Sequence, residues 1–112
     1  ESFGVKRIHG DEFQIQGADK IAERIKKRVG NNPLYLSIDI DVLDPAFAPG
    51  TGTPEIAGMT SREMVNVLRG LSGLNLISAD VVEVSPAYDH AEVTSLAAAT
   101  IVYELTNLFA KK

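Results

Sequence analysis

The chain contains no cysteine, so neither disulfide bonds nor thiolate metal ligands contribute to it. Its 11 basic residues are outnumbered by 15 acidic ones, and a net charge of −4 argues against a nucleic-acid partner. No apolar run approaches the roughly 20 residues of a membrane span, so we expect no membrane partner. The 112 residues contain no internal repeat and correspond to one domain or to part of one. We therefore expect a soluble, globular chain.

The most informative stretch runs from residue 34 to residue 55 and reads LYLSIDIDVLDPAFAPGTGTPE. Apolar and polar residues alternate over residues 34–41, which predicts a strand with Asp39 and Asp41 on one face. Asp44 and Pro45 end this strand, and the run PGTGTP predicts a tight loop at its carboxyl end. Two neighbouring carboxylates repel each other, and a bound metal ion or metal pair would remove that penalty. The simpler alternative is a pair of solvated carboxylates at a strand end.

The remaining pattern predicts a βαβ unit flanked by helices. Apolar spacing predicts a helix over residues 17–29, whose basic outer face we interpret as solvated. Thr60 and Glu63 match a capping box, which predicts a helix over 61–70. Residues 76–84, LISADVVEV, predict a second, buried strand parallel to the first. A short strand is also predicted over Val5–Ile8.

A last helix is predicted after Asp89, which resembles an N-cap residue with an acid, Glu92, three positions later. Its apolar spacing predicts that the following side chains are buried: Val93, Leu96, Ala97, Ile101, Leu105, Leu108 and Phe109.

A third acid belongs with the aspartate pair. Glu83 falls at the carboxyl end of the second predicted strand, and parallel strands place their carboxyl ends at one edge of the sheet. Three acids at one edge favour a cationic ligand. Asp80 points to the opposite face by strand parity, and we expect it to pack against a helix or to form hydrogen bonds.

The stretch from Ser37 to Glu55, SIDIDVLDPAFAPGTGTPE, closely resembles the third signature of the ureohydrolases, the arginase/agmatinase family. The later run VVEVSPAYD is similar to the penultimate motif of that family, in its agmatinase-like branch. The resemblance extends from about Gly17 to the end of the chain. It implies an α/β fold, specifically part of a three-layer α/β/α sandwich around a parallel sheet.

The resemblance also implies a role for individual residues. Asp39 and Asp41 match ligands of a manganese pair, Glu83 matches the acid that receives the guanidinium group, and Thr53 matches a threonine near that acid. In such a site, metal-activated water attacks the guanidinium carbon of a small guanidino substrate and releases urea and an amine. Three residues match loop-shaping positions: Asp44, Gly52 and Pro54.

One departure from the family pattern is important. The upstream GGDH-type and DAHxD-type motifs that complete the metal cluster do not occur, and His9 and His90, in the wrong context to replace them, are interpreted as surface residues. Residues 1–112 therefore resemble the C-terminal segment of a single ureohydrolase domain. We expect this segment alone to bind manganese weakly, to be inactive and to form homo-oligomers through uncovered apolar surface. The compartment stays open between cytoplasm and mitochondrion.

The favoured activity of the parent protein is agmatinase, which converts agmatine to putrescine in polyamine metabolism. Guanidinobutyrase and, because of SPAYD, less readily arginase are the alternatives within the family. An apolar strand that ends in DxD also resembles an aspartyl phosphatase, with Asp39 as nucleophile, Asp41 as general acid and magnesium as cofactor. A non-catalytic binding or assembly module is the alternative outside enzymes.

Overall fold

The computed structural model describes residues 4–110. Two parallel strands, β1 (Leu34–Asp39) and β2 (Leu76–Val82), form the sheet. The helices are α1 (Gly10–Gln16), α2 (Ala18–Val29), α3 (Ser61–Gly70) and α4 (Val93–Ala110), and two short 3-10 helices are η1 (Ile40–Val42) and η2 (Pro86–Tyr88).

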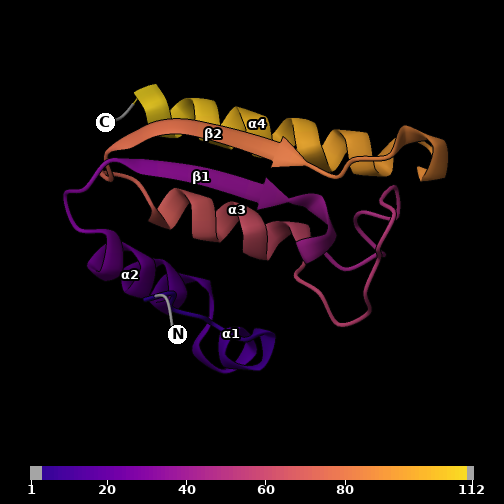
Figure 1. Cartoon of the computed structure of the whole chain (residues 1–112). Helices are drawn as coiled ribbons and strands as arrows, with labels where there is room; N and C mark the ends of the chain where they lie inside the picture. The colour runs from indigo at the N-terminus through magenta and orange to yellow at the C-terminus, as the bar shows by residue number, and fades with distance from the viewer. Residues whose placement is uncertain (1–3, 111–112) are drawn as a thin grey trace.

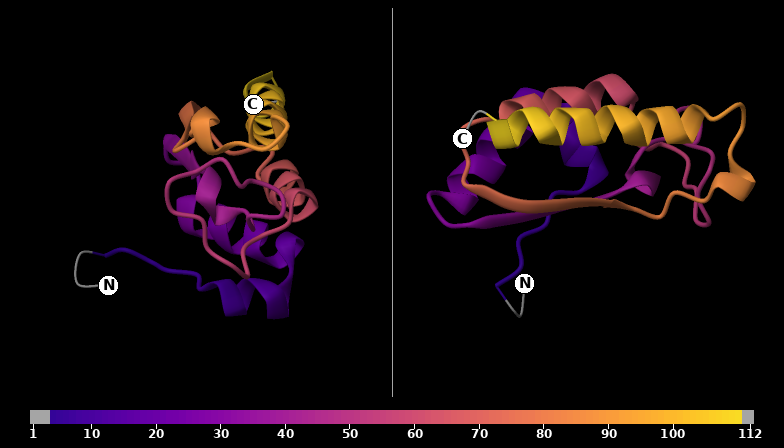
Figure 2. Two further views of the ribbon diagram at one scale, coloured as in Figure 1. Left: turned by 90° about the vertical axis from the view of Figure 1, so that its right-hand side faces the viewer. Right: turned by 90° about the horizontal axis from the view of Figure 1, so that it is seen from above.

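Helices α3 and α4 cover one face of the sheet, and no described helix covers the other face (Figures 1 and 2). Strand β1, helix α3 and strand β2 form the predicted βαβ unit, but β2 ends two residues earlier than predicted. The α/β class with a parallel sheet is thereby confirmed. The prediction that β2 is buried is wrong, because one face of the sheet is uncovered and only Leu76 of β2 is fully buried. The described residues build two layers of the expected three-layer sandwich.

The core lies between the sheet and the helices. Alternation along β1 turns Leu34, Leu36 and Ile38 toward it, as predicted. Gly70 lets α2 and α3 approach closely, because a Cβ atom there would lie 2.6 Å from the Cβ of Ala22. The buried residues of the main cluster are Ala22, Ile38, Ile40, Leu43, Ala48, Met64, Leu68, Leu71, Leu74, Leu76, Ile101, Leu105 and Leu108.

Helix α3 begins with the predicted capping box. The Glu63 amide donates to Thr60 Oγ1 at 3.0 Å, and the Thr60 amide donates to Glu63 Oε1 at 2.9 Å. Two N–H groups that the first helical turn leaves without partners are thereby satisfied.

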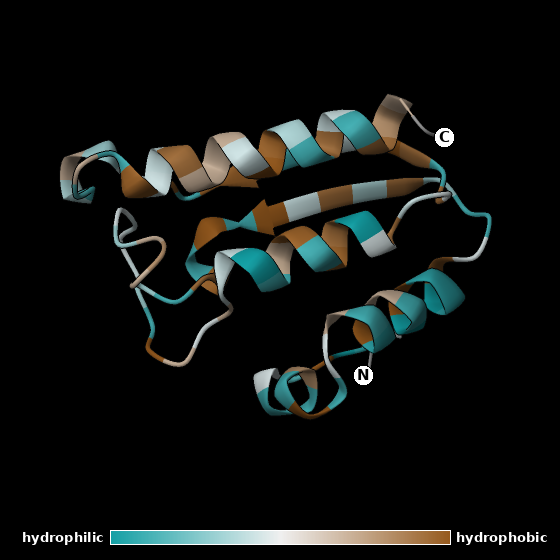
Figure 3. Ribbon diagram, turned by 180° about the vertical axis from the view of Figure 1, so that it is seen from behind, coloured by the Kyte–Doolittle hydropathy of each residue, from teal (hydrophilic) through white to brown (hydrophobic). Residues whose placement is uncertain are grey.

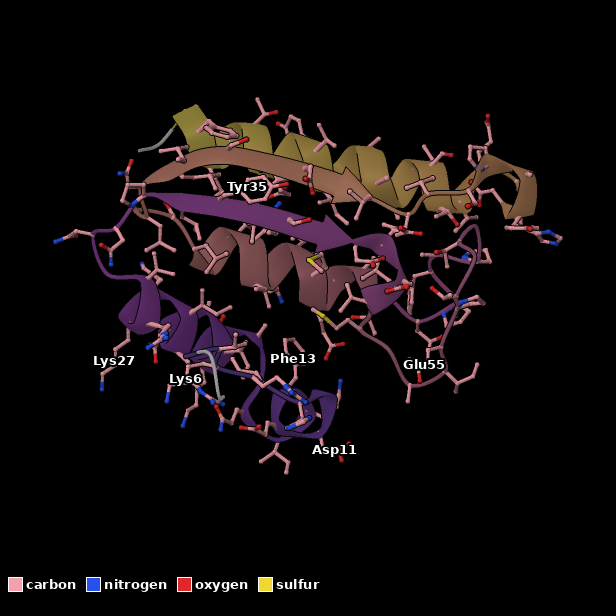
Figure 4. All side chains as sticks on the ribbon, viewed as in Figure 1. Lys6, Asp11, Phe13, Lys27, Tyr35 and Glu55 are labelled. Atoms are coloured by element: carbon pink, nitrogen blue, oxygen red, sulfur yellow. The ribbon has the colours of Figure 1, made fainter. Side chains whose placement is uncertain are left out.

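The uncovered face of the sheet carries a polar cluster. Ser37 Oγ donates to Asp80 Oδ1 at 2.5 Å, and the Tyr35 hydroxyl donates to the other carboxylate oxygen; Figure 4 labels Tyr35 at the strands. The hydrogen bond from Ser37, followed by that from Tyr35, holds the pKa of Asp80 below its usual value. Asp80 in turn raises the pKa of Tyr35. The hydrogen-bonding role expected for Asp80 is confirmed.

The prediction of a strand over Val5–Ile8 is wrong. This segment is extended but pairs with no strand in the described part of the chain, and helix α1 follows it. Phe13 of α1 is buried against Ile21 and Val67, so an apolar anchor on α1, rather than strand pairing, holds this region in place.

Helix α4 is rotated relative to the prediction. Ile101, Leu105 and Leu108 are buried as expected, but Leu96 is 65% exposed, and Val93 and Phe109 are 39% and 38% exposed. The buried face instead includes Thr94 and Glu104, which α4 directs toward the interior. Apolar positions remain on its outer side (Figure 3), so apolar spacing does not define its orientation.

By length and composition alone, α4 is long and apolar enough to cross a membrane, which corrects the expectation that no segment approaches such a span. A single such helix is weak evidence, because core helices of globular proteins have the same properties. Glu104 on α4 is only 5% exposed and forms a two-pronged pair with Arg69 of α3, with Nε–Oε1 and Nη2–Oε2 distances of 3.0 and 3.2 Å. This pairing and the contact with β2 favour a helix that covers the sheet.

Candidate functional site

Asp39 and Asp41 lie side by side at the carboxyl end of β1. The strand ends at Asp39, two residues earlier than predicted, and the chain turns into η1 with Asp41 inside it. The Asp41 amide donates to Asp39 Oδ1 at 3.1 Å, so the Asp39 side chain caps η1. This cap, and not strand alternation, holds the two acids together.

Asp44 closes the loop that follows. Its Oδ1 accepts the Ala46 amide at 2.9 Å, and its Oδ2 accepts the amides of Ala57 and Gly58 at 3.1 and 3.3 Å. One carboxylate thus joins the two ends of the loop, on which Figure 4 labels Glu55. The structure supports the loop-shaping role of Asp44.

Glycine is sterically required at one end of this loop. A Cβ atom on Gly58 would lie 2.6 Å from the Asp44 nitrogen, closer than a side chain can approach a backbone atom. At Gly52 an added Cβ would meet no heavy atom within 4 Å, so space does not explain glycine there.

Thr53 projects from this loop toward the aspartate pair. Its hydroxyl donates to Asp41 Oδ2 at 2.7 Å. Within the described residues, no hydrogen bond links Thr53 to Glu83, the acid that the family motif associates with it. The structure therefore brings Thr53 to Asp41, and its relation to substrate stays a prediction.

Glu83 lies at the same edge of the sheet as the aspartate pair. Asp39 is in register with Val82, and Glu83 is the next residue. Its φ of 70° is in the left-handed region, which costs a non-glycine residue roughly 1–2 kcal/mol. The Ser85 amide, two residues on, donates to the Gly50 carbonyl at 2.7 Å and so secures the segment after Glu83 to the loop.

Asp39 and Asp41 are ligands of the chemical kind that binds manganese, but two residues are too few to hold the ion. Asp39 and Asp41 each use one carboxylate oxygen in the hydrogen bonds above and keep the other for a cation. Oxygen donors of this kind suit hard divalent cations such as manganese. Among the described residues, however, no group of three or more potential ligands is close enough to hold a metal ion. These two residues therefore fit as part of a metal site.

Both histidines, His9 and His90, are exposed, as predicted. The His9 amide donates to Glu12 Oε1 at 3.3 Å, at the start of α1. Neither histidine belongs to a potential metal group within residues 4–110.

Asp89 secures the start of α4, although not as a capping box. Its carboxylate accepts the Thr94 amide at 2.9 Å and the Ser95 amide at 3.0 Å. Burial of Asp89 opposes ionisation, but hydrogen bonds from Thr94, Ser95 and His90 outweigh it and hold the pKa well below its usual range. Glu92 has a φ of 61° and precedes the helix, so its predicted part in the cap is wrong.

Thr94 is a functional candidate that the sequence did not predict. It is completely buried, and its Oγ1 accepts the Gly50 amide at 2.6 Å. A threonine beside an apolar helical pattern gives no signal of such a contact, because its partner lies 44 positions away in sequence.

A parallel α/β unit with an acidic edge at the carboxyl ends of its strands defines the class of this protein. Residues 1–107 match the Arginase family model. The chain belongs to the arginase family.

Curated relatives and solved structures agree with this assignment. The chain is 56% identical over 108 residues to putative agmatinase 1 of Schizosaccharomyces pombe, an alignment that covers 96% of this chain and 27% of that protein. It is 51% identical over 108 residues to a guanidinopropionase of Pseudomonas aeruginosa, covering 96% of this chain and 34% of that protein. A proclavaminate amidino hydrolase from Streptomyces clavuligerus has a TM-score of 0.96 at 46% identity, covering 98% of this chain and 36% of that chain. The chain thus spans about a quarter to a third of the length of these proteins.

Proposed function

We propose that the chain supplies one carboxylate-bearing part of a manganese-dependent ureohydrolase, which hydrolyses a guanidino compound to urea and an amine. The observation that carries this proposal is the hydrogen-bonded group of Asp39, Asp41 and Thr53 at the carboxyl edge of the sheet. Membership of the arginase family supports it and removes the basis for the aspartyl phosphatase alternative.

Each acid has a proposed task. The free oxygens of Asp39 and Asp41 hold manganese together with ligands from outside the described residues, and Thr53 orients Asp41 through its hydroxyl. Bound there, manganese acts as a Lewis acid that makes water nucleophilic at neutral pH. Glu83 receives the planar guanidinium group through paired, charge-assisted hydrogen bonds.

Agmatine is the favoured substrate, with putrescine as the amine product. The similarity to putative agmatinases supports this choice, but a guanidinopropionase is nearly as similar. Guanidinobutyrate and arginine are the other candidates. The share of the relatives that the chain covers suggests that residues reading the far end of the substrate lie elsewhere in a complete ureohydrolase.

The test is urea release by the complete protein that contains this chain, with manganese, for agmatine, guanidinopropionate, guanidinobutyrate and arginine. We expect urea from at least one substrate and a loss of roughly a hundredfold or more in Asp39→Asn, since metal ligation is weakened. Asp19→Asn on the exposed side of α2 is the matched control and should retain full activity. Urea from none of the four substrates would contradict the proposal and favour a non-catalytic module.

We further propose that residues 1–112 are the C-terminal segment of the ureohydrolase domain and are inactive alone. The incomplete ligand set and the covered share of the relatives support a partial, inactive domain, and the resemblance of VVEVSPAYD to the penultimate motif of the family supports its C-terminal position. Calorimetric titration with manganese should show weak binding. Urea formation by the purified segment, free of longer protein, would contradict the proposal.

The chain alone should also self-associate. Within the described residues β1 and β2 each pair on one side only, and these open strand edges, together with exposed apolar residues of α4 such as Leu96 and Tyr103, support this expectation, whereas the uncovered face of the sheet is polar. Light scattering should give a mass above that of a monomer. A monomer at high concentration would count against it.

A further inference from the structure

Two segments that contribute to the candidate site, the Thr53 loop and the segment after β2, are joined at Gly50, which lies outside the site. The loop from residue 44 to residue 58 carries Thr53, and the segment after β2 carries Glu83. The Gly50 amide donates to Thr94 Oγ1 at 2.6 Å, and the Gly50 carbonyl accepts the Ser85 amide at 2.7 Å. Gly50 is thus bonded on one side to α4 and on the other to the segment that follows Glu83.

The fit around Gly50 is tight. A Cβ atom there would lie 2.9 Å from Asp89 Cβ and 2.9 Å from Thr94 Oγ1. Asp89 is itself secured by the amides of Thr94 and Ser95. The contact therefore has little freedom to shift without moving the start of α4.

We propose that Thr94 is a positioning residue for the ureohydrolase reaction. Through Gly50, its buried hydroxyl holds the Thr53 loop and the Glu83 segment in one arrangement. This inference rests on the proposed function, because it assigns Glu83 to the substrate. Among the hydrogen bonds of the described residues, none links Thr94 to the candidate ligands Asp39 and Asp41.

The left-handed backbone at Glu83 supports this role. A strained residue keeps its conformation only where its surroundings impose it. The hydrogen bond from Ser85 to Gly50 is such a restraint, two residues after Glu83. Loosening Gly50 would allow Glu83 to relax and move its carboxylate.

The test compares Thr94→Val, which keeps the shape but removes the acceptor, with Thr94→Ser, which keeps the hydroxyl. Thr100→Val is the matched control, because the Thr100 hydroxyl on the same helix donates to the Leu96 carbonyl, within α4 itself. All variants are made in the complete protein that contains this chain. The measurements are kinetics of urea release, manganese content and amide hydrogen exchange.

We expect kcat/KM of folded Thr94→Val to fall roughly tenfold to a hundredfold, the range that a displacement of about 1 Å produces. Manganese content should stay unchanged, Thr94→Ser should restore activity, and Thr100→Val should behave as wild type. A purely structural Thr94 would lower thermal stability but leave kcat/KM of the folded protein intact, and that result would overturn the proposal.

Hydrogen exchange separates this proposal from the proposed function. In Thr94→Val the amides of Gly50 and Ser85 should exchange about tenfold faster or more, while the Glu63 amide of the α3 cap stays protected. If the wild type releases no urea, the proposed function fails, yet these amides still report on the contact. Unchanged exchange at both amides would overturn the positioning role, whatever the activity.

Discussion

Asp44 offers a sharp test of how the site loop is held. Its two carboxylate oxygens accept three backbone amides, from Ala46, Ala57 and Gly58, at 2.9–3.3 Å. We consider Asp44→Ala, which removes every acceptor, and Asp44→Asn, which leaves one. Neither change alters the core.

The expected magnitude follows from the exposure of the three donors. A hydrogen bond to a charged group contributes about 1.5–3 kcal/mol when water cannot replace it. Ala46 and Ala57 are exposed, so water replaces the acceptor there, and the half-buried Gly58 amide dominates the loss. Asp44→Ala should therefore lower the free energy of unfolding by about 2 kcal/mol, and Asp44→Asn by about 1 kcal/mol.

Urea unfolding measures this difference, and hydrogen exchange localises it. The amides of Ala57 and Gly58 should lose protection in both variants, whereas the Glu63 amide should not. Asp19→Ala, at an exposed position on α2, is the matched control. A change in Asp44→Ala within about 0.5 kcal/mol, the range of ordinary surface substitutions, would refute the reasoning.

Three further predictions address stability elsewhere in the chain. The pKa of Asp89 is lowered in the folded state, so the stability that this carboxylate contributes is complete above its unfolded pKa of about 3.9 and is lost as the pH falls below that value. Asp89→Asn should therefore flatten the dependence of the unfolding free energy on pH in this acidic range, and an unchanged dependence would contradict the lowered pKa. Thr60→Ala should lower the free energy of unfolding by about 1 kcal/mol through loss of the helix cap, while Thr60→Ser should stay close to wild type; equal losses in the two variants would argue against the cap. Leu68→Ala in the core should lower it by about 2–5 kcal/mol, whereas Ile15→Ala at an exposed position of α1 should change it by less than about 0.5 kcal/mol; similar values for both would contradict the place of Leu68 in the core.

Local sequence determined the elements whose signals act over a few residues. Alternation over residues 34–38 predicted β1 and its buried face, and the Thr60–Glu63 pair predicted the start of α3. The parallel pairing of the two strands follows from the helix between them, which leaves room for a crossover connection. The DxD motif likewise indicated where acids would gather.

Only the tertiary structure decided how α4 is rotated. Apolar residues surround much of this helix, so periodicity cannot select a buried face. The selection is made by two polar contacts with distant residues, Thr94 with Gly50 and Glu104 with Arg69. Both lie 35 or more positions apart in sequence, beyond any local pattern.

The candidate site divides in the same way. The sequence by itself determined which residues carry the acids, because carboxylates after an apolar strand are a local pattern. The turn that moves Asp41 off the strand is capped by the Asp39 side chain, which lies two positions away in sequence. By contrast, the hydrogen bond from Thr53 to Asp41 and the bond from Ser85 to Gly50, which secures the segment after the left-handed Glu83, join residues 12 and 35 positions apart. Chain segments that meet only after folding set these details, so no local pattern could have predicted them.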